Sequence, residues 1–305
     1  MTAPREILPG RTYHLSRRTT QRQFLLRPDE DTTAIIAYCL AEAAARHQLE
    51  LIAWCAMSNH YHAIVHDPFG RLPSFIEHLH KMLARSLNAR WQRWENLWSA
   101  EQTCVTLLPT PEAVFDKVCY VLANPTTDHL VDRLSDWPGC TSLAHLDGRR
   151  TTHKRPRAFF SRESTMPEQA ELFVSQPPCS KAVESADAWA TRVRAAVEDA
   201  ERGAREKRIR EGRRIFGRKA VLNVSHLETP STVAPRQSLR PAVACKDPSR
   251  RKEELKKLID FRRRYDEARR RYVNGEHDVE FPAGTYQLRA WGVRCAPYPS
   301  PVMAA

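Results

Sequence analysis

The segment LIAWCAMSNHYHAIVHD, residues 51–67, decides how the first half of the chain is expected to fold. Residues 49–57 form an apolar run with the length of a buried strand. A Ser-Asn pair, which favours a turn, separates this run from residues 60–66, which return as a second strand. Alternate residues of a strand point to the same face, so His60 and His62 are expected to project side by side.

Helix and strand patterns continue on both sides of this expected hairpin. Residues 12–16 follow a Pro-Gly pair and are expected to form a short strand, and a Pro-Asp pair then opens a helix that runs to about residue 47. A second helix is expected over residues 72–94, and a β-branched strand over residues 103–108.

A third helix has a clear start signal. Thr110 is a good N-cap residue, and Pro111 occupies the first helical position, where its missing N–H costs nothing. The helix is expected to end near Asn124, because Pro125 disfavours helical geometry in the residue before it.

These elements follow one another in the order β-α-β-β-α-β, with one more helix after them. This order is typical of the split βαβ, ferredoxin-like arrangement, an antiparallel sheet with its helices on one face. We therefore predict an α+β fold in which the other face of the sheet is free for a ligand.

The charge of the chain is concentrated in its second half. Residues 1–150 carry 16 Lys and Arg and 16 Asp and Glu, whereas residues 151–305 carry 32 and 20, so the whole net charge of +12 lies there. Such an excess favours a nucleic acid as partner, because clustered cations release counterions from phosphate. A solvated helix surface explains the density of charge, but it explains the excess of one sign less easily.

We expect a catalytic domain over residues 1–148 and a basic, partly helical C-terminal extension over residues 149–305. Within the extension, helices are expected over residues 182–214 and 250–272, and a terminal strand over residues 281–291.

Several classes of protein receive no support from the sequence. The eight cysteines contain no C-x-x-C pair, which argues against a zinc knuckle or ribbon. The longest apolar run is too short to cross a bilayer, and residues 1–10 hold no apolar signal core. Residues 212–219 lack the Gly-Lys-Ser order of a phosphate-binding loop. A cytoplasmic, nucleoid-associated protein is therefore expected.

Two pairs of residues have spacings that suit chemistry. His60 and His62 can chelate one divalent ion, although packing or solvation on a half-exposed strand explains an isolated His-x-His pair slightly better. Helix spacing puts Tyr120 and Asn124 on one face, beside the apolar stripe. Their ordinary explanations are a boundary tyrosine with a wet hydroxyl and a polar residue at a helix end.

In combination, these motifs resemble those of single-tyrosine HUH transposases, in particular the REP-associated tyrosine transposases of bacteria. The resemblance covers roughly residues 8–145. It rests on Asn-His-Tyr-His at residues 59–62, on Tyr120-x-x-x-Asn124-Pro125, and on Ser-Asp-Trp-Pro at residues 135–138. The segment 9–14, which leads into Arg17, is similar to the family's opening strand.

The resemblance implies that Tyr120 is the nucleophile and that Mg²⁺ or Mn²⁺ is bound by His60, His62 and, as third ligand, Asn124. The reaction would cut and rejoin single-stranded or hairpin DNA, such as inverted repeats, through a 5′-phosphotyrosine. A homodimer is left open. The bulky Tyr61 departs from the small or apolar residue usual between the histidines, but alternation points it to the opposite face.

The residues expected to contact DNA lie outside this catalytic set. They are Arg17 and Arg18 at the end of the first strand, and the basic cluster Arg213, Arg214, Arg218 and Lys219 in the extension.

Two other functions stay open at this point. A domesticated relative would bind hairpin or repeat DNA without transposing its own gene. An unrelated metal hydrolase would need a carboxylate beside the histidine pair, and Asp67 is the nearby candidate.

Overall fold

The computed structural model describes residues 4–157, 165–233 and 241–299. Its main sheet has four antiparallel strands in the order β2-β3-β1-β4, and β5 and β6 form a separate pair. The strands are β1 (Arg11–Arg18), β2 (Glu50–Ala56), β3 (His60–Asp67), β4 (Cys104–Leu107), β5 (Thr151–Lys154) and β6 (Gln169–Leu172). The helices are α1 (Glu30–His47), α2 (Leu72–Trp91), α3 (Pro111–Thr127), α4 (Pro178–Lys181), α5 (Ala186–Arg210), α6 (Arg218–Asn223), α7 (Pro248–Val273) and α8 (Gln287–Ala290). Within these ranges, no helix has the length and apolar character needed to cross a membrane.

The predicted α+β order is confirmed: β1-α1-β2-β3-α2-β4 is followed by α3. The turn of the β2-β3 hairpin is closed by the N–H of Met57, which donates to the carbonyl of His60 at 2.8 Å. α1 begins where expected, because the Asp29 carboxylate accepts a hydrogen bond of 2.9 Å from the N–H of Thr32.

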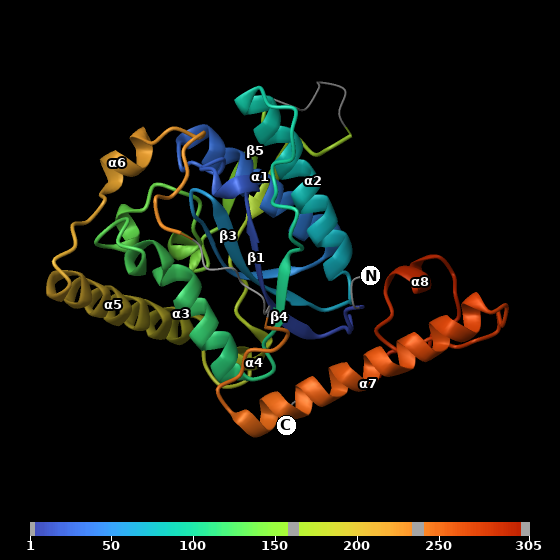
Figure 1. Cartoon of the computed structure of the whole chain (residues 1–305). Helices are drawn as coiled ribbons and strands as arrows, with labels where there is room; N and C mark the ends of the chain where they lie inside the picture. The colour runs from blue at the N-terminus through green and yellow to red at the C-terminus, as the bar shows by residue number, and fades with distance from the viewer. Residues whose placement is uncertain (1–3, 158–164, 234–240, 300–305) are drawn as a thin grey trace.

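The two faces of the main sheet carry different helices (Figure 1). α1 and α2 pack on the face that holds Tyr13, Leu15 and Tyr61, as expected for the helices of this fold. α3 packs on the opposite face, against Ile64 and residues of β2. We expected that face to be free, but the apolar stripe of α3 covers part of it, because the stripe would otherwise face water.

α3 also runs further than expected, through Pro125 to its end at Thr127. The proline lies in the last turn, so its missing N–H removes only one helical hydrogen bond. Carbonyls of this turn find other donors: the hydroxyl of Thr126 bonds to the carbonyl of Ala123 at 2.8 Å, and that of Thr127 bonds to Asn124 at 3.1 Å. The local bias against helix before a proline is therefore outweighed here.

Part of the C-terminal extension packs into the same hydrophobic cores as the first half. β6 lies against α1 and buries Ala170 and Leu172 in the core beneath α1 and α2. α5 lies along α3 and buries Trp189 and Val193 in the second core (Figure 1). α5 and α7 confirm the two helices expected in the extension, whereas its separation into a second domain stays a prediction.

The terminal strand expected over residues 281–291 is wrong. Phe281 makes one isolated bridge with Cys295, and the chain then turns at Gly284, whose φ is 87°, into α8. Pro282 also removes a backbone donor that a paired strand needs. The segment nevertheless docks on the first half, since the carbonyl of Gly284 accepts a 3.0 Å hydrogen bond from the N–H of Ile7.

Trp189→Ala is expected to lower the free energy of unfolding by about 3 to 5 kcal/mol, because the side chain is 2% exposed and fills the space between α3 and α5. Urea unfolding followed by circular dichroism measures this loss. Trp291→Ala, at a tryptophan that is 70% exposed, is the control and should change stability little. A loss as small as the control's would show that α5 does not support the core. For the same reason, deletion of residues 151–305 is expected to unfold the chain.

Candidate active site

Three histidines and a tyrosine meet where β1, β3 and α3 face one another. The ring centroids of His60 and His62 are 4.9 Å apart, and those of His14 and His62 are 5.1 Å apart in a stacked arrangement. The Tyr120 ring stands edge-on to them, 5.5 Å from His62 and 6.1 Å from His14. The structure therefore places Tyr120 next to His62, one member of the predicted histidine pair.

Burial keeps these imidazoles neutral at ordinary pH. It is the main cause that lowers the pKa of His60 to about 4, with a further contribution from Arg18, and that of His14 to about 3, with a contribution from Lys117. The pKa of His62 is also well below its ordinary value, through burial first and then through its histidine neighbours. Neutral imidazole is the form that binds a metal ion.

Hydrogen bonds orient the two rings of the pair. Nδ1 of His60 lies 2.7 Å from Oδ1 of Asn59, an acceptor, so His60 donates from Nδ1 and its Nε2 keeps the free lone pair. Nδ1 of His62 lies 3.0 Å from Nε2 of His14. When His62 is the donor of that bond, its Nε2 is free as well. Metal-binding histidines usually donate their second N–H in this way, so both rings fit a divalent ion.

His14 is the member of the cluster to which the sequence analysis gave no role. Antiparallel pairing of β1 with β3 sets Ser16 opposite His62 and His14 opposite Ile64, so that His14 and His62 share a face. No local pattern shows this pairing. The available signal was the ferredoxin-like order itself, because its first and third strands are neighbours at the centre of the sheet.

Asn124 lies on α3 one turn after Tyr120, but it is less accessible than expected of a ligand. It is 4% exposed, and among the described residues no hydrogen bond joins its side chain to His60 or His62. The described residues also contain no group of three His, Cys, Asp or Glu side chains arranged to hold one metal ion. The histidine pair thus fits a metal as two ligands, and the third ligand stays a prediction.

The two tyrosines near the site differ in access. Tyr120 is 47% exposed, and the ammonium of Lys117 lies 4.7 Å from the centre of its ring. Tyr61 points to the opposite face, as alternation predicted, and its hydroxyl lies 2.7 Å from Nε2 of His80. Burial raises the pKa of Tyr61 above its ordinary value. Only Tyr120 can therefore reach a phosphate beside the histidines.

The predicted DNA-contacting residues occupy different places. Arg18 lies on the histidine face, opposite His60 in the sheet, whereas Arg17 lies on the other face and bonds to Nδ1 of His80 at 2.7 Å. The extension's basic cluster begins after α5 and continues into α6, which starts at Arg218. Two of its members already have partners, Glu211 for Arg213 and the carbonyl of Asp136 for Arg218. Arg214 and Lys219 are the other members.

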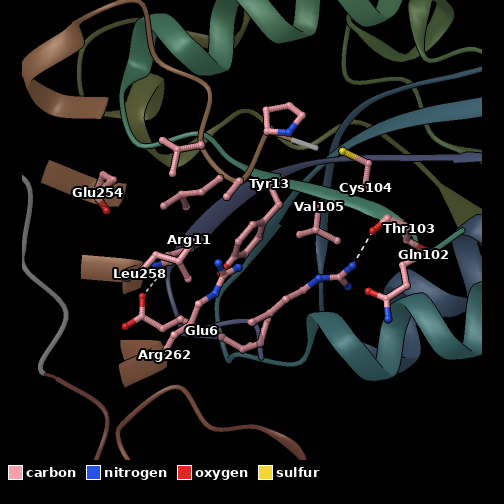
Figure 2. A pocket seen from close by; sticks show the side chains of 16 residues that line it. Glu6, Arg11, Tyr13, Gln102, Thr103, Cys104, Val105, Glu254, Leu258 and Arg262 are labelled. Carbon is pink, nitrogen blue, oxygen red and sulfur yellow. Dashed lines mark hydrogen bonds and ion pairs between the residues drawn. The ribbon is translucent and has the colours of Figure 1, made fainter. Parts of the chain in front are cut away.

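A cavity of about 200 Å³ lies elsewhere, between the β1–β4 edge of the sheet and α7 (Figure 2). Figure 2 shows Tyr13 inside it and the ion pair of Arg11 with Glu6, whose atoms are 2.7 Å apart. Neither the histidine cluster nor Tyr120 lines this cavity. The candidate active site is instead the open cluster under α3.

Residues 9–109 match the family model described as "Transposase IS200 like". The matched segment is about a third of the chain and includes β1 to β4 with the histidine pair, but it ends before Tyr120. Over these residues the chain is similar to the IS200-like transposases, in agreement with the resemblance of its motifs to single-tyrosine transposases.

Two solved structures are similar to the chain. One is a REP-associated tyrosine transposase bound to a REP hairpin, with 16% identity and a TM-score of 0.41, covering 57% of this chain and 99% of that one. The other is described as a transposase from Deinococcus radiodurans R1, with 23% identity and a TM-score of 0.29, covering 41% of this chain and 97% of that one. No curated protein matches the chain.

Proposed function

We propose that the protein cuts and rejoins single-stranded or hairpin DNA, with Tyr120 as the nucleophile and Mg²⁺ or Mn²⁺ bound by His60 and His62. The observation that supports this most directly is a half-exposed tyrosine beside the buried, neutral imidazole of His62, whose ring lies next to that of His60. The match of residues 9–109 to the IS200-like transposase model agrees with this proposal. Asn124 is proposed as the third ligand.

The chemistry follows from these side chains. When bound, the ion would neutralise a nonbridging oxygen of the scissile phosphate. The oxygen of Tyr120 attacks phosphorus, the bond to the 3′ oxygen breaks, and the 3′ oxygen leaves as a free hydroxyl while a 5′-phosphotyrosine forms. Tyr120 loses its proton in this step, and the nearby ammonium of Lys117 stabilises the developing phenolate. The reverse attack restores the phosphodiester without ATP.

Asp67 does not supply the carboxylate that the metal-hydrolase alternative needs beside the histidine pair. Asp67 is fully buried at the far end of β3, and its oxygens accept hydrogen bonds from the backbone N–H groups of Phe69, Arg71 and Leu72. The residue therefore caps the start of α2 and does not face the histidine pair. A domesticated hairpin- or repeat-binding relative, which would not transpose its own gene, stays the second candidate, and trapping of a covalent DNA adduct separates it from a transposase.

His14→Asn is expected to raise the half-saturating concentration of Mn²⁺ in the cleavage assay by about 10- to 100-fold, because His62 loses the partner that orients its ring. The matched control is His66→Asn, on the same face of β3 as His62, whose ring bonds to the hydroxyl of Thr12. Its Mn²⁺ requirement should stay that of the wild type. Equal requirements in His14→Asn and the wild type would contradict the positioning role.

Reversal of the charges at Arg213, Arg214, Arg218 and Lys219 is expected to flatten the dependence of log affinity on log salt. Each lost phosphate contact should change the slope by about 0.7 for a single strand and about 0.9 for a duplex stem. Arg214 and Lys219 should account for most of the change, since Arg213 and Arg218 already have protein partners. The control is Arg202→Glu, at an arginine paired with Asp199. An unchanged slope in the fourfold variant would rule out this surface.

A further inference from the structure

A second polar pocket lies on the opposite face of the sheet from the histidine cluster. Its volume is about 380 Å³, and it is bounded by the end of β1, α2 and the segment that follows α2. Two tryptophans line it: Trp98 is buried under the guanidinium of Arg17 at 5.4 Å, whereas Trp94 is 96% exposed. An aromatic ring so fully presented to solvent beside a polar pocket favours a ligand with a flat face.

The polar groups of this pocket are short of partners. The amide nitrogen of Asn88 donates to the carbonyl of Glu95 at 2.7 Å, and this bond leaves Oδ1 of Asn88 shielded from water without a donor. Arg17 bonds to His80 through Nη1, while its Nε is shielded and has no acceptor. Shielded polar atoms without partners are rare because they cost free energy. A ligand with both donors and acceptors on one edge would complement this pocket after a small adjustment.

The pocket opens at the same rim of the sheet as the candidate active site. The segment after α2 pairs with the end of β1, since Thr20 donates to the carbonyl of Leu97 at 2.8 Å and Ser99 donates to that of Arg18 at 3.0 Å. Thr19 in turn donates to the carbonyl of Asn59, the residue before His60. Because Arg17 and Arg18 point to opposite faces, one strand of DNA crossing this rim would meet both arginines.

We propose that this pocket binds one unpaired nucleobase of the DNA strand whose scissile phosphate lies at Tyr120, an inference that rests on the proposed function. Trp94 stacks on the face of the base, and Arg17 and Asn88 meet its edge. Every base has a π face, and its edge carries donors or acceptors for the two polar side chains. A base within a duplex is already stacked and paired, so the pocket selects single-stranded DNA next to the cleavage position.

The test uses the full chain and two single-stranded probes of equal length: oligo(dT), and an abasic oligomer that carries the same phosphates without bases. The wild type is expected to bind oligo(dT) about tenfold more tightly than the abasic oligomer, as one stacked base predicts. Trp94→Ala should lose most of this preference, and Trp94→Phe should keep part of it. Trp291→Ala, at an exposed tryptophan far along the sequence, should keep all of it.

The outcomes separate this inference from the proposed function. If Trp94→Ala keeps the full preference for oligo(dT), or if the wild type has none, the pocket does not bind a base. If the same preparations still form a Tyr120-dependent covalent adduct, only the pocket is overturned. If the wild type neither binds nor cuts single-stranded DNA, the proposed function fails, and the inference fails with it.

Discussion

Tyr120→Phe is expected to abolish strand cleavage, by at least about a thousandfold, while leaving the affinity for DNA nearly unchanged. Removal of the hydroxyl removes the attacking atom itself, whereas the ring keeps its contacts with His62 and with the ammonium of Lys117. A gel assay for the covalent adduct and a filter-binding assay on the same preparation measure the two quantities separately.

The matched control is Tyr61→Phe. Its hydroxyl faces away from the histidine pair and bonds to His80, so its loss should cost some stability and leave cleavage largely intact. Cleavage that survives Tyr120→Phe but disappears in Tyr61→Phe would refute the assignment of the nucleophile.

Chelation of divalent ions by EDTA is expected to stop cleavage, and His60→Ala or His62→Ala should each remove most of it. One remaining imidazole would hold an ion loosely, because both of the neighbouring rings are proposed as ligands of the same ion. Asn124→Ala should be milder, because a water molecule can replace one neutral ligand. Restoration of activity by Mn²⁺ after removal of EDTA is the measurement that ties the loss to the metal.

Binding must be measured in parallel, since the alanine variants open space in a buried site. If they bind DNA as the wild type does and fail only to cut, the loss lies in the chemical step. Full cleavage in EDTA would eliminate the metal role and leave Tyr120 to act with Lys117 alone.

The sequence by itself determined the local elements and the face on which their side chains lie. The β2-β3 hairpin, the start of α1 at Asp29 and the start of α3 at Thr110 all follow from short-range preferences. Strand alternation separated Tyr61 from the histidine pair, since that separation depends only on the period of the backbone. The spacing of Tyr120 and Asn124 on one helix was equally local.

Only the tertiary structure decided which elements meet. His14 joins His62 through pairing between strands that are far apart in the chain, and α5 enters the core through its contact with α3. The segment after α2 closes a pocket around Arg17 by pairing with the end of β1. Such contacts depend on the sum of many weak burial and packing terms over distant residues, so no local pattern reveals them. The same reason explains why Asn124 proved to be buried. It lies where α3 packs against the sheet, and the spacing of residues along α3 does not show which of them meet the sheet.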